Sequence, residues 1–94
     1  MGHLVESAVG SYLLALANER RSDVHWWREG TDEVDFVISQ ADDVVAIEVK
    51  NGCVKSLKGL AAFVNRFPGA RILVVGSAEC PLERFFAGEV PLFG

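Results

Sequence analysis

The chain has 94 residues, of which 50% are hydrophobic and 23% are charged, and its formal net charge is −4. This length and composition predict one small domain with a substantial core over residues 1–94, and they exclude two domains, intrinsic disorder and collagen-like sequence. Because the longest apolar run is too short to span a bilayer and no secretory signal pattern is present, we expect a cytoplasmic protein with no membrane partner.

The first half of the chain predicts one helix and three strands. Apolar residues recur at steps of three and four over residues 4–18, which is typical of an amphipathic helix. Three runs rich in β-branched and aromatic residues then predict a meander of strands. These runs are residues 24–28, 34–39 and 44–50. A helix that begins almost at residue 1 leads us to expect a fragment, or a stand-alone version, of a longer protein.

The second half predicts a helix, a strand and a short last helix. Ser56 is a candidate N-cap for a helix with Leu57 and Leu60 on its inward face, which ends at Pro68. Residues 71–76 form an unbroken apolar run, which is typical of a strand covered on both faces, and Pro81 begins a short helix. A strand, helix and strand in succession favour parallel pairing, so we expect an α/β fold with a mixed sheet flanked by helices.

The two cysteines do not indicate a disulfide framework or a zinc site. Cys53 and Cys80 would form at most one bridge, so we expect reduced thiols. His3 and His25 lie at no finger-like spacing from them.

The charge is unevenly distributed. Residues 1–50 carry a net charge of −6 and residues 51–94 carry +2. The overall negative charge argues against nonspecific attraction to phosphates, so any nucleic-acid contact would be local. Lys50, Lys55 and Lys58 form the one candidate basic stripe, and Lys55 and Lys58 are our candidates for binding nucleic acid. A solvated start of a helix explains them equally well.

The hairpin between the second and third strands predicts that two acids meet. A turn centred between Ala41 and Asp42 pairs residues whose numbers sum to 83. One face of the ladder is then apolar, with Val34 facing Val49, Phe36 facing Ile47 and Ile38 facing Val45. On the other face Asp35 lies across from Glu48, and Lys50 follows two residues after Glu48.

Opposed carboxylates about 5 Å apart repel by roughly 3 kcal/mol at an effective dielectric constant of 20, so the pair needs an explanation. One acid takes up a proton, a basic side chain such as Lys50 pairs with both, or a divalent cation lies between them. The third explanation predicts a magnesium site, because hard oxygen ligands suit that ion.

These residues resemble a known family. Glu6 on the first helix, Asp35 within Val34-Asp35-Phe36-Val37, and the tripeptide Glu48-Val49-Lys50 resemble the pattern of the PD-(D/E)XK nuclease superfamily. The resemblance implies a restriction-endonuclease-like αβββαβ core. A narrower resemblance, which includes Leu57-Lys58-Gly59-Leu60, is to the uncharacterised nuclease-like C-terminal domain of bacterial and archaeal AAA-type ATPases.

The resemblance implies a role for each site residue. Asp35 and Glu48 would bind Mg²⁺ or Mn²⁺ together with the Val49 carbonyl, and Glu6 would assist from the helix. Lys50 would orient or deprotonate the attacking water, and the reaction would be hydrolysis of phosphodiester bonds. The sequence departs from the pattern at Val34, which replaces the proline, and after Lys50, where no glutamine follows.

Two functions follow as expectations. The first is a metal-dependent nuclease-like domain that acts on DNA with an ATPase partner, with a homodimer needed to cut both strands of a duplex. The second is a non-catalytic module that keeps the nuclease fold for DNA binding or assembly. A weaker third idea is self-association through the apolar residues 90–93.

Each candidate side chain also has a purely structural explanation. Asp35 and Glu48 would be an exposed sheet face, Lys50 their ion-pair partner, and Glu6 an ordinary helix-start acid. Trp26 and Trp27 are expected to pack in the core rather than to stack on bases.

Overall fold

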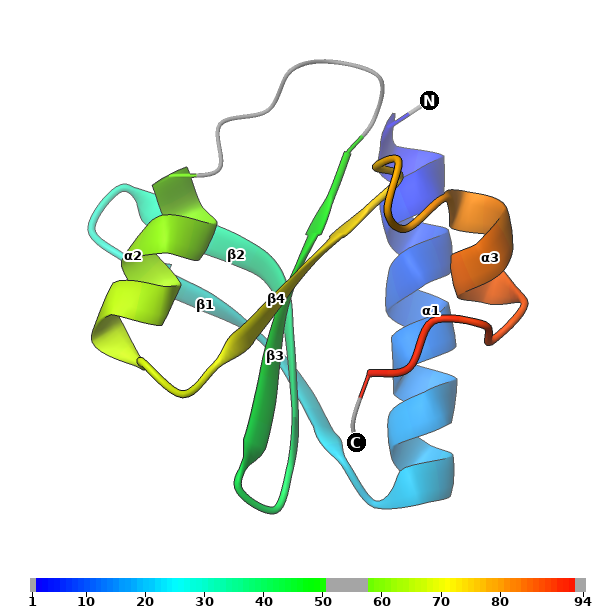
Figure 1. Cartoon of the computed structure of the whole chain (residues 1–94), viewed down its shortest axis with the longest axis horizontal. Coiled ribbons are helices and arrows are strands. Elements are labelled where there is room, and N and C mark those ends of the chain that lie inside the picture. The colour runs from blue at the N-terminus through cyan, green and yellow to red at the C-terminus, as the bar shows by residue number, and fades with distance from the viewer. Residues whose placement is uncertain (1, 51–57, 93–94) are drawn as a thin grey trace.

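The computed structural model describes residues 2–50 and 58–92, with side chains from residue 5 onward (Figure 1). Three helices and four strands alternate in the order αβββαβα, as the sequence predicts. They are α1 (Gly2–Arg20), β1 (Asp23–Glu29), β2 (Asp32–Gln40), β3 (Asp43–Val49), α2 (Lys58–Arg66), β4 (Arg71–Val75) and α3 (Leu82–Phe86).

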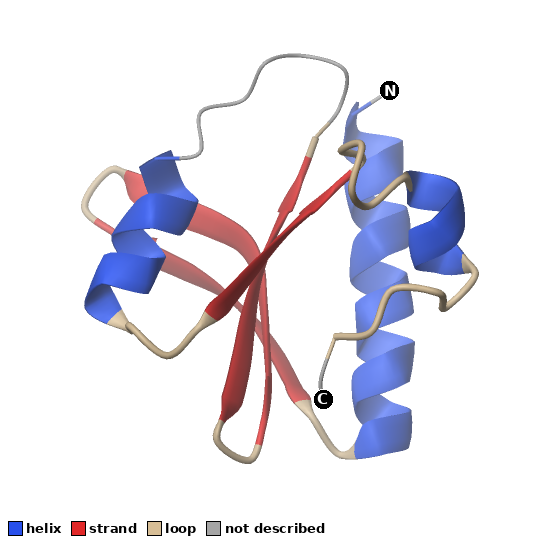
Figure 2. Ribbon diagram, in the orientation of Figure 1, coloured by secondary structure: helices blue, strands red, loops and turns tan. Residues whose placement is uncertain are grey.

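The strands form one mixed sheet in the order β1-β2-β3-β4. The first three strands pair antiparallel, and β4 pairs parallel with β3 after the segment that contains α2. The expectation of a parallel crossover is therefore confirmed. Helices flank the sheet on both sides, with α1 and α3 on one side and α2 on the other (Figure 2). The fold class is α/β with a mixed sheet flanked by helices, compatible with the αβββαβ description.

Each face of the sheet has its own hydrophobic cluster. On the α1 side, buried residues of α1 and α3 pack against alternate residues of β2 and β3, such as Ile38 and Ile47. On the α2 side, Leu60 and Phe63 pack against Val37 and Ala46. The middle strand β3 is covered on both faces, which explains why its residues 44–47 are all apolar.

The register of the central hairpin agrees with the prediction over most of its length. Phe36 pairs with Ile47, and Ile38 pairs with Val45, around the turn at Ala41 and Asp42. The prediction for Val34 is wrong. It lies in the cluster on the α2 side instead of sharing the α1 face with Phe36 and Ile38.

A β-bulge in β2 is the physical reason for this correction. His25 of β1 pairs with Val37, whereas Trp27 pairs with Val34, so two residues of β2 lie opposite Trp26. These two residues are Asp35 and Phe36. An extra residue in one strand reverses the alternation of side chains beyond it, which places Val34 on the opposite face.

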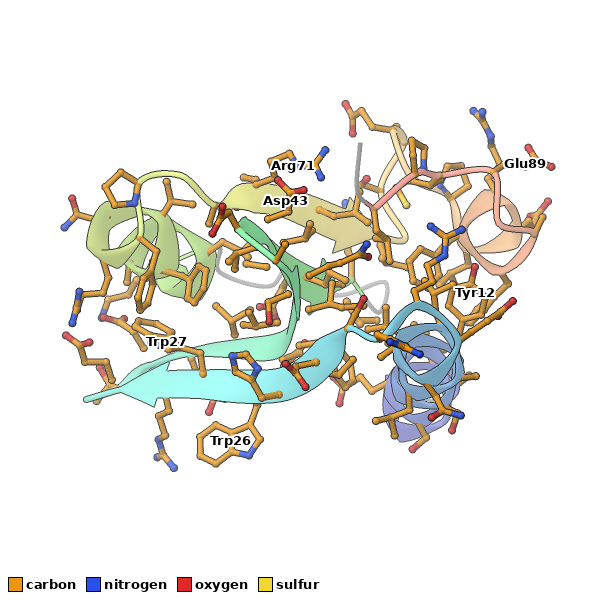
Figure 3. The ribbon with its side chains drawn as sticks, turned by 90° about the horizontal axis from the view of Figure 1, so that it is seen from below. Tyr12, Trp26, Trp27, Asp43, Arg71 and Glu89 are labelled. Atoms are coloured by element: carbon orange, nitrogen blue, oxygen red, sulfur yellow. The ribbon has the colours of Figure 1, made fainter. Side chains whose placement is uncertain are left out.

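The two tryptophans differ, although the sequence led us to expect both in the core. Trp27 packs edge-on against Phe63, with ring centroids 5.2 Å apart. Trp26 is 66% exposed and points away from the sheet (Figure 3), so the expectation is wrong for this residue. It lies opposite the bulge on an edge strand.

Cys80 is a free thiol that is buried in the hydrophobic cluster on the α1 side. Burial raises the pKa of this thiol, and the nearby Arg84 opposes the shift. Cys53, Lys55, Ser56 and Leu57 lie outside the described residues. Within residues 2–50 and 58–92, no helix has the length and hydrophobicity that crossing a bilayer requires.

Gly59 seats the start of α2 directly on the backbone of β2. A Cβ atom at this position would collide with the carbonyl oxygen of Glu33 and would lie 2.9 Å from its carbonyl carbon. Because both groups are backbone, neither side can rotate away, and any larger residue would push α2 off the sheet.

We predict that Gly59→Ala destabilises the domain by about 1–3 kcal/mol, measured by urea unfolding, because the overlap outweighs the usual gain of alanine over glycine in a helix. Gly69→Ala is the matched control, since no atom lies within 4 Å of the added Cβ there. It should change stability by less than about 0.5 kcal/mol. A stabilised Gly59→Ala protein would contradict the close approach.

Candidate acidic site

The β-bulge aims the side chain of Asp35 at the end of β3. In an uninterrupted antiparallel ladder of this register, the N–H of Val49 would donate to the carbonyl of Val34. The pairing of β2 with β3 instead ends at Phe36 and Ile47. The N–H of Val49 donates to Oδ2 of Asp35 at 3.4 Å. Asp35 therefore replaces a backbone acceptor at the point where β2 and β3 separate.

Asp35 and Glu48 line one pocket of about 210 Å³, which we call the acidic pocket. Its lining comes from the β1–β2 turn, β2, β3 and the first residues of α2. The lining residues are Thr31, Asp32, Glu33, Asp35, Glu48, Lys58 and Gly59. The lining of this small space therefore includes four acidic residues and one lysine.

Glu48 is the most buried of these acids, with 6% of its surface exposed. It occupies β3 between Ile47 and Val49, both fully buried on the α1 face, so its own side chain emerges on the α2 face. Taking a carboxylate out of water is unfavourable, and its position beside Asp35 adds repulsion. Packing alone would favour an apolar residue here.

The backbone N–H and C=O of Val49 also face the side of β3 on which Asp35 lies. Its N–H points to Asp35, whereas the N–H of the next residue, Lys50, points the opposite way and donates to the Val75 carbonyl at 2.8 Å. The N–H and C=O of one strand residue point to the same side. The Val49 carbonyl therefore faces the space between β2 and β3.

Lys58 lies at the rim of the acidic pocket. Its Nζ atom is 3.3 Å from Oδ1 of Asp32, and 70% of its side chain is exposed. The same Oδ1 atom is shielded from solvent and accepts no hydrogen bond, so its local compensation is the ion pair. Lys58 is thus placed to neutralise acid in the pocket, and its exposed ammonium is also reachable from outside.

Glu6 and Lys50 do not line the acidic pocket. Glu6 lines a second hollow of about 410 Å³, beside α1, together with Gly10 and Phe36. Phe36 follows Asp35 in the bulge, so two consecutive residues line the two hollows. Lys50 is exposed at the end of β3. Of the four predicted site residues, Asp35 and Glu48 share a pocket, and Glu6 and Lys50 lie outside its lining.

The oxygen donors of the acidic pocket fit a divalent cation only in part. Among the residues that the structure describes, no group of three or more His, Cys, Asp or Glu side chains is arranged to hold a metal ion. Mg²⁺, however, is usually held by one or two carboxylates, with waters and substrate phosphates as further ligands. Asp35, Glu48 and the Val49 carbonyl fit that requirement as oxygen donors.

Sequence reasoning missed Asp32, Glu33 and Gly59 as parts of this pocket. The three acids within residues 32–35 were a signal that could have indicated more acidic residues at the pocket, because they concentrate negative charge at the start of one strand. No signal in the sequence placed Gly59 against Glu33, since that contact depends on the position of α2 over the sheet.

Comparison with known proteins gives one positive result. A family model described as "Domain of unknown function (DUF4143)" matches residues 1–92. No curated protein and no solved structure matches the chain. The matched range includes every residue of the acidic pocket.

The crowding of carboxylates in the acidic pocket predicts a salt-dependent stability. In a buffer free of divalent cations at 10 mM salt, Asp35→Asn should raise the free energy of unfolding by about 1 kcal/mol, because it removes repulsion from Glu48 and keeps an acceptor for Val49. The gain should fall by at least about half in 1 M NaCl, where charges are screened within about 3 Å.

Glu19→Gln is the control, because it removes one acid from the exposed end of α1. Its stability should change little at either salt concentration. If Asp35→Asn were as stable as the original protein at low salt, the carboxylates would not repel one another.

Proposed function

The chain belongs to the DUF4143 family, and we propose that its acidic pocket holds a divalent cation with which the domain hydrolyses phosphodiester bonds in DNA. The observation that supports this proposal most is the presence of Asp35 and Glu48 in one small pocket. They lie on the two strands on which the resemblance to PD-(D/E)XK nucleases requires them.

We propose that Asp35 and Glu48 would hold Mg²⁺ or Mn²⁺, with the Val49 carbonyl as a third oxygen donor. When bound, such an ion lowers the pKa of a water molecule and stabilises the leaving oxygen of a phosphodiester. The protein itself supplies the fixed position of these donors. The bulge and the Val49 N–H fix Asp35, and the core around β3 fixes Glu48.

The basic side chains would orient the substrate. Lys50 follows Glu48 by two residues and is exposed, so its ammonium would hold the scissile phosphate or the attacking water. Lys58 at the pocket rim, and Lys55, would contact the DNA backbone locally. Glu6 would act from the other side of the bulge, where its hollow includes Phe36.

An ATPase partner would deliver the DNA. The family is typically associated with ATPases, and a chain of net charge −4 attracts DNA poorly by itself. The 94 residues contain no phosphate-binding loop of the glycine-rich type that ends in Lys and Ser or Thr. ATP hydrolysis would therefore come from another module, and a pair of nuclease-like domains would cut both strands of a duplex.

One observation favours the alternative, a non-catalytic module for DNA binding or assembly. Lys58 already pairs with Asp32, and among the described residues no group of three or more His, Cys, Asp or Glu side chains is arranged to hold a metal ion. A domain that kept the nuclease fold without cutting DNA would retain such a partly neutralised pocket.

Calorimetric titration with Mn²⁺ tests the metal site. We expect one binding event in the original protein, loss of that event in Asp35→Asn and Glu48→Gln, and unchanged binding in Glu19→Gln. Absence of binding in the original protein would refute the metal site and would leave the assembly function.

A cleavage assay with circular duplex DNA and with single-stranded DNA tests the reaction. With Mn²⁺ present we expect Glu48→Gln to lower the rate by at least about 100-fold, because the ion supplies most of the stabilisation of charge. Lys50→Ala should lower the rate and leave Mn²⁺ binding intact. Metal binding without cleavage of either DNA, with the ATPase partner added, would establish the non-catalytic alternative.

A further inference from the structure

Gly76 follows the point at which β3 and β4 end together. The two strands are parallel and both run upward in Figure 1, and their last pair is Val49 with Val75. The N–H of Lys50 then donates to the Val75 carbonyl at 2.8 Å, so the ladder continues for one hydrogen bond past the end of β3. The lysine that follows Glu48 by two residues is therefore held by the end of β4, directly beside Gly76.

The position of Gly76 leaves no room for a side chain. Its φ angle is 98°, a conformation that glycine adopts without the strain that other residues incur. A Cβ atom at this position would lie 2.7 Å from the carbonyl oxygen of Lys50 and 3.6 Å from the Cβ atom of Lys50. The first distance is well inside van der Waals contact. Any larger residue at position 76 would therefore displace either the turn or Lys50.

The turn that begins at Gly76 is anchored to the core. The N–H of Gly76 donates to the Cys80 carbonyl at 2.8 Å. Ser77 closes the turn, because its Oγ atom donates to the Val74 carbonyl at 2.7 Å and accepts from the Cys80 N–H at 3.3 Å. Cys80 itself is only 1% exposed and belongs to the hydrophobic cluster on the α1 side. Lys50 is exposed, so it would move more readily than the turn.

We propose that Gly76 is a positioning residue for Lys50. Because it has no side chain, the Lys50 backbone can lie against the end of β4, which fixes where the lysine side chain starts relative to Glu48 and the acidic pocket. The inference rests on the proposed function, in which Lys50 holds the scissile phosphate or the attacking water. A misplacement of about 1 Å at such a group can lower a rate by about 100-fold.

The DNA-cleavage kinetics of Gly76→Ala test this role. We expect kcat to fall at least about tenfold and the Kd for Mn²⁺ to stay within about twofold, because the lining of the acidic pocket does not include the turn. Gly88→Ala is the matched control. Gly88 also has a positive φ angle, of 75°, but the atom nearest to its added Cβ is the hydroxyl oxygen of Tyr12 at 3.8 Å. This variant has a strained backbone without the collision, so neither value should change.

A double-mutant cycle separates positioning from a general loss of structure. If Gly76 acts through Lys50, Gly76→Ala should lower kcat by less than about twofold when it is added to Lys50→Ala, measured in single turnovers with excess protein. An equally large loss of kcat in both backgrounds would show a structural effect and would overturn the inference. An unchanged kcat in the single variant Gly76→Ala would also overturn it, while the proposed function would stand.

Hydrogen exchange provides a measurement that needs neither metal nor DNA. The N–H of Lys50 should exchange at least about tenfold faster in Gly76→Ala than in Gly88→Ala, because the collision breaks its hydrogen bond to Val75. Equal exchange in the two variants would overturn the inference. If the original protein cuts no DNA and the exchange difference is nevertheless found, the proposed function is overturned, and Gly76 remains the residue that fixes the Lys50 backbone.

Discussion

The N–H of Val49 donates to the carboxylate of Asp35, where a regular ladder would use the carbonyl of Val34. This substitution depends on one extra residue in β2 opposite Trp26. The bulge ends the pairing of β2 with β3 and moves Val34 to the α2 face. It also sets Asp35 into the acidic pocket and Phe36 into the hollow beside α1. A local change of one residue therefore determines which side chains can reach the proposed cation.

Much of the fold could be predicted from the sequence because each element depends on local periodicity. The three- and four-residue steps of α1, the turn at Ala41 and Asp42, and the crossover from β3 to β4 all have short-range signals, and all are found. The face of Val34 could not be predicted in this way. A bulge is set by how two strands pair, and the alternating residues of β2 look regular when β2 is read alone.

The candidate site also combines residues that the sequence predicts with contacts that depend on how distant segments pack. Asp35 and Glu48 were brought together by register arithmetic that requires only the hairpin turn, and both line one pocket. The contribution of α2 was missed, because the approach of Gly59 to Glu33 joins residues that are far apart in the chain. The ion pair between Lys58 and Asp32 depends on the same approach. The position of α2 on the sheet therefore determines whether Lys58 reaches the acidic pocket.

Glu48 departs from the apolar pattern of its strand. Its neighbours Ile47 and Val49 are fully buried, so an apolar residue at position 48 would extend a hydrophobic strand without interruption. A domain of this size has a total stability of about 5–15 kcal/mol, so the contacts of a buried carboxylate must offset most of the cost of removing it from water. Residues that disagree with the local rules of folding are expected where function requires them. The buried acid, more than the number of acids around it, is therefore the reason to look for a cation in this pocket.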